Sequence, residues 1–271
     1  MIRRIAHVSD VHLLDPKTPL QSARYRIATK MVSMGRPIDP IGRRAKLVRA
    51  LEYAKANGAD HFVVSGDLTE VGTDREFELF AEVLDAVQLR PESVTLVPGN
   101  HDAYTTHDGW KRALAGPLRA FRGASAANTA TCVDRGNVVF LPIDSTRFQS
   151  IVRSGGEVTE ETANAVSKVL ADSSFSGKAI AIVQHHPPFV NRAGAIWHWI
   201  DGLVGYARLL ELLVRHPNVQ ILHGHLHKVV DRFVGIGKHR VFGAPATVDD
   251  DDSTPRVRFY DVPNGALVPV G

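Results

Sequence analysis

The sequence contains one cysteine and no long apolar run. The single thiol, Cys132, excludes an intrachain disulfide and fits a reducing compartment, so we expect a cytoplasmic protein in which Cys132 is a small buried residue. No apolar run reaches the length of about 18 residues that a membrane-spanning helix needs. The chain also lacks a Gly-x-x-x-x-Gly-Lys-Ser/Thr phosphate loop and a Gly-x-Ser-x-Gly nucleophile elbow. These absences disfavour kinase-like and serine-hydrolase mechanisms.

What the sequence does contain is enough apolar material for a full core, with positive charge gathered in one stretch. The 271 residues are 44% hydrophobic and show no repeat or linker, so residues 1–271 are interpreted as one domain. Residues 16–51 carry a net charge of +8, while the whole chain carries only +3. Residues 15–40 are interpreted either as a solvated basic helix face with a loop or as a segment that rims an active site and attracts an anionic substrate. A lid helix, a homodimer contact and a peripheral membrane patch are all compatible with this segment.

Local patterns predict alternating helices and strands followed by a β-rich end. A helix is expected over residues 41–57, after the Asp39 cap and a proline, and a second helix follows the capping box that opens at Thr73. Residues 229–271 contain short strands separated by Gly, Pro, Asn and Asp, which suggests a second sheet. Further helices are expected to begin near Asp108, Thr159 and Gly205.

Five apolar, strand-like runs each end in a short cluster of Asp, Asn or His. Such runs are typical of parallel strands buried on both faces, and an open α/β sheet binds its ligands beyond the carboxyl ends of those strands. Each cluster alone is also ordinary turn chemistry, but the repeated placement favours a shared site at one edge of the sheet. The clusters are Asp10-Val11-His12, Gly66-Asp67, Gly99-Asn100-His101-Asp102, His185-His186 and His223-Gly224-His225-Leu226-His227.

The donor types in these clusters indicate transition metals. Carboxylates, an amide and imidazoles without a thiolate suit Mn, Fe, Co, Ni or Zn, rather than a structural thiolate zinc site or an all-oxygen calcium cage. Two Asp, one Asn and several His, seven side chains in all, are too many for one tetrahedral ion and match two ions that share a bridging carboxylate. We therefore expect two divalent or trivalent ions, with Mn or Fe favoured, roughly 3.5–4 Å apart.

The order Asp-x-His, Gly-Asp, Gly-Asn-His-Asp, His and Gly-His-x-His resembles the calcineurin-like metallophosphoesterase superfamily, and it spans residues 10–227. The resemblance implies a four-layer α/β/β/α sandwich of two mixed sheets flanked by helices. The runs Gly99-Asn100-His101-Asp102, His185-His186-Pro187-Pro188 and Ile143-Asp144-Ser145 are most similar to the bacterial class III cyclic nucleotide and glycerophosphodiester phosphodiesterases. Carried over, the resemblance implies one metal on Asp10, His12, Asp67 and His227, and another on Asn100, His185 and His225, with Asp67 bridging.

The resemblance implies hydrolysis of a phosphodiester in a small anionic substrate, such as a cyclic nucleotide or a glycerophosphodiester. Two ions lower the pKa of a shared water, which then attacks phosphorus in line. His101, oriented by Asp102, is expected to give a proton to the leaving group. The alternatives are a phospholipid or lipid-linked diphosphate hydrolase at the membrane surface, and a non-catalytic metal-binding scaffold. A nuclease is disfavoured because the positive charge is confined to one stretch.

Several residues near the clusters have roles that the pattern leaves open. Trp197 and Trp199 could stack a nucleobase, contact an acyl chain or pack in the core. The run of four aspartates at 249–252 is interpreted as a solvated loop tip with no catalytic role. Of the other histidines, His7 and His61 are expected to be structural, His107, His216 and His239 to lie in loops or at the surface, and His186, His198 and His223 are undecided.

Overall fold

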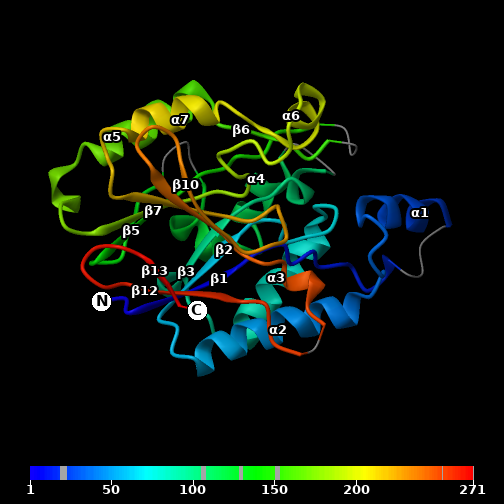
Figure 1. Ribbon diagram of the computed structural model, residues 1–271. Coiled ribbons are helices and arrows are strands. Elements are labelled where there is room, and N and C mark those ends of the chain that lie inside the picture. The colour runs from blue at the N-terminus through cyan, green and yellow to red at the C-terminus, as the bar shows by residue number, and fades with distance from the viewer. Residues whose placement is uncertain (19–22, 105–107, 128–130, 150–152, 252, 271) are drawn as a thin grey trace.

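The computed structural model describes residues 1–18, 23–104, 108–127, 131–149, 153–251 and 253–270 (Figure 1). Two large sheets pack face to face, and helices cover their outer faces. This arrangement is the expected α/β/β/α sandwich. His107 lies outside the described residues.

The first sheet has the strand order β13-β12-β1-β2-β3. Its strands β1, β2 and β3 are parallel and, apart from Arg4 at the start of β1, buried on both faces, whereas β12 and β13 are added antiparallel. The pairing of Arg4 with Asp261 sets the register between the two ends of the chain. The strands are β1 Arg4–Val8, β2 His61–Ser65, β3 Val94–Val97, β12 Arg258–Asp261 and β13 Val268–Val270.

The second sheet has the order β10-β11-β9-β7-β5-β4. The expectation of one sheet edge was wrong, because β7 and β9 belong to this sheet while β1, β2 and β3 belong to the first. The C-terminal strands are also divided, since β10 and β11 join the second sheet and β12 and β13 the first. Its strands are β4 Val133–Asp134, β5 Val138–Pro142, β7 Ala179–Val183, β9 Val219–His223, β10 Val230–Val234 and β11 His239–Gly243, and a small parallel pair joins β6 Gly156–Glu157 to β8 Leu203–Val204.

The helices form two outer layers, with α2, α3 and α4 against the first sheet and α5 and α7 against the second (Figure 1). The Asp39 side chain accepts from the Gly42 N–H at 2.9 Å, and Thr73 forms both halves of its capping box with Glu76. Both predicted helix starts are therefore confirmed. The α-helices are α1 Ala23–Val32, α2 Pro40–Ala56, α3 Asp74–Ala86, α4 Gly109–Ala115, α5 Glu160–Leu170, α6 Ala195–Asp201 and α7 Tyr206–Leu213.

A third apolar cluster fills the space between the two sheets. His61 of β2 is fully buried there, stacks on Phe140 of β5 with ring centroids 4.4 Å apart, and pairs with Thr95 at 2.9 Å. Its structural role is as expected. Two other predictions were wrong: His239 is buried in β11 instead of lying at the surface, and Cys132 is exposed instead of buried.

None of the helices within the described ranges is long and apolar enough to cross a lipid bilayer. Helices α1 and α6 lie to one side of the two helix layers (Figure 1). Among the described residues, neither helix belongs to the apolar clusters that hold the two layers. The sequence offered α1 only as a possible lid helix within residues 15–40, and it did not predict α6. Their position matters because both contribute to the cavity described below.

Candidate metal centre

The backbone that carries the polar clusters is conformationally strained. Non-glycine residues rarely adopt positive φ, and such residues gather at functional sites. Gly99 must be glycine because a Cβ atom there would lie 2.2 Å from the Asp67 Oδ1 atom. Five of the expected metal ligands have φ between 51° and 68°, namely Asp10, His12, Asp67, His225 and His227.

Asp67 lies at the centre of the assembled clusters. Its Oδ2 atom is 3.3 Å from His185 Nε2, 3.7 Å from His12 Nε2 and 4.0 Å from His101 Nε2. Its Oδ1 atom accepts from the backbone N–H of His101 at 2.9 Å. The side chain thus faces ligand groups from both sheets, as a bridging carboxylate would.

Asn100 gathers the donors on one side of Asp67. Its Oδ1 atom lies 3.2 Å from both His185 Nε2 and His225 Nδ1. Its amide nitrogen donates to the Tyr104 hydroxyl at 2.9 Å, which turns the oxygen toward the two imidazoles. Tyr104 was not singled out by the sequence, and its position four residues after Asn100 was the only local signal.

On the other side of Asp67, His227 Nε2 lies 3.4 Å from Asp10 Oδ1. Asp10 also accepts from the backbone N–H of His225, with its Oδ2 at 3.1 Å. The ligand atoms of Asp10, His12 and His227 all lie within 4.8 Å of one another, as do those of Asp10, Asp67 and His185. The structure therefore brings all seven expected ligands together, although they come from two sheets.

The imidazoles hold one nitrogen toward a protein acceptor and leave the other toward the centre. His185 Nδ1 donates to the Ser65 carbonyl at 2.8 Å, and His12 Nδ1 lies 3.3 Å from Glu70 Oε2. This is the arrangement usual for metal-bound histidine, where a second group fixes the ring. The Nε2 atom of His12, on the opposite side of the ring, is buried and without a hydrogen-bond partner in the described part of the chain, so the donor set fits a metal ion.

The protonation of the centre shows how a metal would be accommodated. Burial lowers the pKa of His185, but the carboxylates of Asp67 and Asp10 outweigh it and raise that pKa to about 9. Burial likewise opposes the charge on His227, yet Asp10 and Asp249 raise its pKa to about 10. Both imidazoles therefore hold a second proton at neutral pH. Metal ions would replace those protons, so binding should release them.

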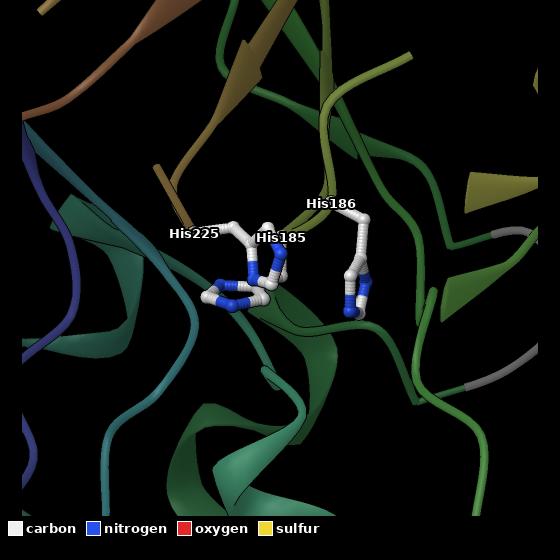
Figure 2. A group of neighbouring side chains, drawn as sticks. All are labelled: His185, His186 and His225. Carbon is white, nitrogen blue, oxygen red and sulfur yellow. The ribbon is translucent and has the colours of Figure 1, made fainter. Parts of the chain in front are cut away.

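His186, which the sequence left undecided, lies beside two expected ligands, His185 and His225 (Figure 2). Both of its ring nitrogens are hydrogen-bonded to the protein, Nδ1 to the Ser145 hydroxyl and Nε2 to the Ser154 carbonyl, each at 2.9 Å. Burial and the neighbouring histidines hold its pKa well below the ordinary value, so the ring is neutral. His186 is therefore a structural residue at the edge of the centre.

Asp102 does not orient His101, contrary to the expectation. The His101 Nδ1–H donates to the Glu70 carbonyl at 2.7 Å, so the ring presents Nε2 to the centre. The Asp102 carboxylate instead accepts from the backbone N–H groups of Leu68, Thr69 and Gly99, at 2.8 to 3.1 Å. It ties the loop that carries Asp67 to the loop that carries His101.

The aspartate run at 249–252 is not a solvated tip where it begins. Asp249 Oδ2 lies 2.8 Å from His227 Nδ1, and the backbone just before it is bound to the first cluster, with Thr247 N–H donating to the Ser9 carbonyl at 2.9 Å. Asp250 is buried and pairs with Arg49. The expectation of a solvated tip was wrong for Asp249 and Asp250, because their partners His227 and Arg49 lie far away in the sequence.

We expect Asp249→Asn to weaken metal binding by about 10- to 100-fold, the range typical of a carboxylate that supports a metal-bound histidine. The charge that holds His227 Nδ1–H is lost while the shape is kept. A metal titration of the purified apoprotein measures the effect. Asp251→Asn is the matched control, since Asp251 belongs to the same run but is exposed, and among the described residues its side chain accepts hydrogen bonds from Ser253 alone. Equal affinities in both variants would contradict this role.

A cavity of about 540 Å³ opens over the centre. Trp197 of α6 is part of its wall, whereas Trp199 is more than half exposed and stacks with Arg153. The basic segment at residues 15–40 contributes Met31, Val32, Met34 and Arg36 to the wall of this cavity. The centre itself contributes Asp67, Asn100, His101, Tyr104, His225 and His227.

Comparison with known proteins agrees with this geometry. Residues 3–229 match the calcineurin-like phosphoesterase family, which covers most of the chain. The chain belongs to that family. It is accordingly a metal-dependent phosphoesterase, and members of this family depend on a dinuclear metal centre.

Among its relatives is the glycerophosphodiester phosphodiesterase GpdQ of Enterobacter lignolyticus, 28% identical over 226 residues, which are 83% of this chain and 71% of GpdQ. A probable GpdQ of Arcobacter nitrofigilis is 28% identical over 174 residues, 63% of this chain and 57% of that protein. Among solved structures, a dimetal phosphatase from Danio rerio superposes with a TM-score of 0.70 at 14% identity, over 99% of this chain and 98% of that one. This last likeness supports the fold alone.

Proposed function

We propose that this phosphoesterase hydrolyses a phosphodiester bond in a small anionic substrate, such as a glycerophosphodiester or a cyclic nucleotide. The convergence of the seven expected ligand side chains, with Asp67 at their centre, beneath an open cavity carries the proposal. The similarity to the GpdQ phosphodiesterases supports a diester substrate. In the proposed assignment Asp10, His12, Asp67 and His227 hold one ion, and Asp67, Asn100, His185 and His225 hold the other.

Two such ions supply charge neutralisation of the phosphate and activation of the attacking water. The protein supplies the proton for the leaving group. Because the Glu70 carbonyl accepts from His101 Nδ1–H, a proton on Nε2 points into the cavity beside Asp67. The Glu70 carboxylate lies on the other side of this ring, with Oε1 3.9 Å from Nδ1.

A screen of the manganese-loaded protein tests the proposal. Cyclic nucleotides, glycerophosphodiesters, nucleotide sugars and phospholipid vesicles are compared by kcat/KM, with metal-stripped protein as the control. We expect a soluble diester to give the highest value and the stripped protein to be inactive. Hydrolysis of none of these esters would contradict the proposed activity and favour the non-catalytic scaffold.

One observation favours a second candidate, hydrolysis of a lipid-linked phosphoester at a membrane surface. Apolar side chains on α1, its following turn and α6 are more than half exposed and lie among basic residues such as Arg26 and Lys30. Preferential hydrolysis of the vesicles in the same screen would support this candidate over the first. The apolar side chains are Ile27, Met31, Met34, Ile196 and Trp199.

A further inference from the structure

Arg36 is a cation in the cavity wall that the family motifs do not include. It lies in the turn between α1 and α2 and shares the cavity with Asp67, His101 and His227. Its Nε and Nη2 atoms are buried and have no hydrogen-bond partner in the described ranges. Burying guanidinium N–H groups without acceptors is unfavourable, so a cation kept in this state indicates an anion that binds there.

The other two arginines in the cavity wall are already engaged. Arg153 Nε donates to the Trp199 carbonyl at 3.0 Å, and its guanidinium lies 4.2 Å from the Trp199 ring centroid. Arg192 lies 4.7 Å from the Trp197 ring centroid and 4.0 Å from Asp201. Both belong to the packing of α6, whereas Arg36 has donors to offer to a ligand.

The backbone around Arg36 is fixed to the centre. Ser33 Oγ donates to Glu70 Oε1 at 2.6 Å, and Arg43 Nη2 donates to the Pro37 carbonyl at 2.9 Å. Arg43 and Glu70 form a buried ion pair, and Glu70 in turn faces His12. Because these bonds hold residues on both sides of Arg36, the arginine is placed by the fold and does not reach the cavity by chance.

Arg36 shares the cavity with His227, whose Nδ1 atom lies 2.8 Å from Asp249 Oδ2. Arg36 therefore lies on the His227 side of the centre, next to the space where a substrate phosphate would sit.

We propose that Arg36 binds the non-bridging oxygens of the substrate phosphate in this cavity. The inference rests on the proposed function of the site and adds a binding residue to it. The planar guanidinium offers two parallel N–H donors to an anion, a geometry that lysine does not match. The basic segment at residues 15–40 therefore acts through Arg36, whose Nε and Nη2 atoms are buried, and the exposed charges of α1 are secondary.

Binding of inorganic phosphate to the manganese-loaded protein tests Arg36 directly. Arg36→Gln is expected to keep two metals per chain and to raise the phosphate dissociation constant roughly 10- to 100-fold, as loss of a charged hydrogen-bonding partner does. Arg36→Lys should recover only part of that loss. Lys30→Gln is the matched control, because it removes one exposed charge of the same insert outside the cavity wall, and it should change the constant less than about threefold. Calorimetry gives the constants and elemental analysis the metal content.

Several results would overturn the proposal. The first is unchanged phosphate binding in Arg36→Gln, the second is an equal loss in Lys30→Gln, and the third is loss of metal in Arg36→Gln, which would make Arg36 a structural support of the centre. Absence of phosphate binding in the unmodified loaded protein would also contradict it. A protein that binds phosphate through Arg36 yet hydrolyses none of the screened esters would support this site while contradicting the proposed function.

Discussion

Asp67→Ala is expected to leave the protein unable to retain two metal ions and to lower phosphodiester hydrolysis by at least about 10³-fold. The Asp67 carboxylate is buried and faces His185, His12 and His101 within 4.0 Å. A bridging carboxylate serves both ions, and each ion contributes several kcal/mol of charge stabilisation in the transition state. Elemental analysis of the purified variant gives the metal content.

Two further variants make this test specific. Asp67→Asn keeps the size of the side chain and guards against misfolding from a cavity, and it should also fail to hold two ions because the amide carries no charge. Asp85→Ala removes an exposed carboxylate at the end of α3 and should bind metal like the unmodified protein. Two tightly bound metals in folded Asp67→Ala would show that Asp67 does not bridge.

Local features of the fold followed from the sequence because their causes are local. The Asp39 and Thr73 caps were readable since the capping side chain and its N–H partner lie within three residues. The apolar runs of β1, β2 and β3 were readable because both faces of each strand are buried. The division of the strands between two sheets could not be predicted, because it depends on pairing between residues far apart in the sequence, such as Arg4 and Asp261.

The same distinction applies to the site. The candidate ligands were recognised because each closely follows a strand, and the structure brings these side chains together. That they bind metal stays a prediction. Glu70 and Asp249 were missed as supports of His12 and His227, because each acts through a contact that depends on loop packing. Arg36 was one of nine basic residues in residues 16–51, and only the folded backbone distinguishes it from the exposed charges of α1.

His101→Ala is expected to keep both metals and to lose about 10² to 10⁴ in rate on diesters with poor leaving groups, the range typical of a general acid. His101 lies beside the proposed ligands, and its Nε2 atom is 4.0 Å from Asp67 Oδ2. Its other ring nitrogen, Nδ1, donates to the Glu70 carbonyl. An alkoxide leaving group needs the proton that this nitrogen would hold. Steady-state kinetics with alkyl and nitrophenyl phosphodiesters measure the two cases.

The rate loss on alkyl diesters divided by the rate loss on nitrophenyl diesters is the decisive quantity, because it separates proton donation from positioning. A nitrophenolate leaves without a proton, so the loss in His101→Ala should shrink strongly for nitrophenyl esters. His101→Gln should behave similarly, since an amide can keep a hydrogen bond to the Glu70 carbonyl but cannot deliver a proton. His216→Ala, outside the cavity wall, serves as the control and should leave both rates unchanged. Equal losses for good and poor leaving groups would instead make His101 a phosphate-binding residue, and the proton would then have to come from solvent.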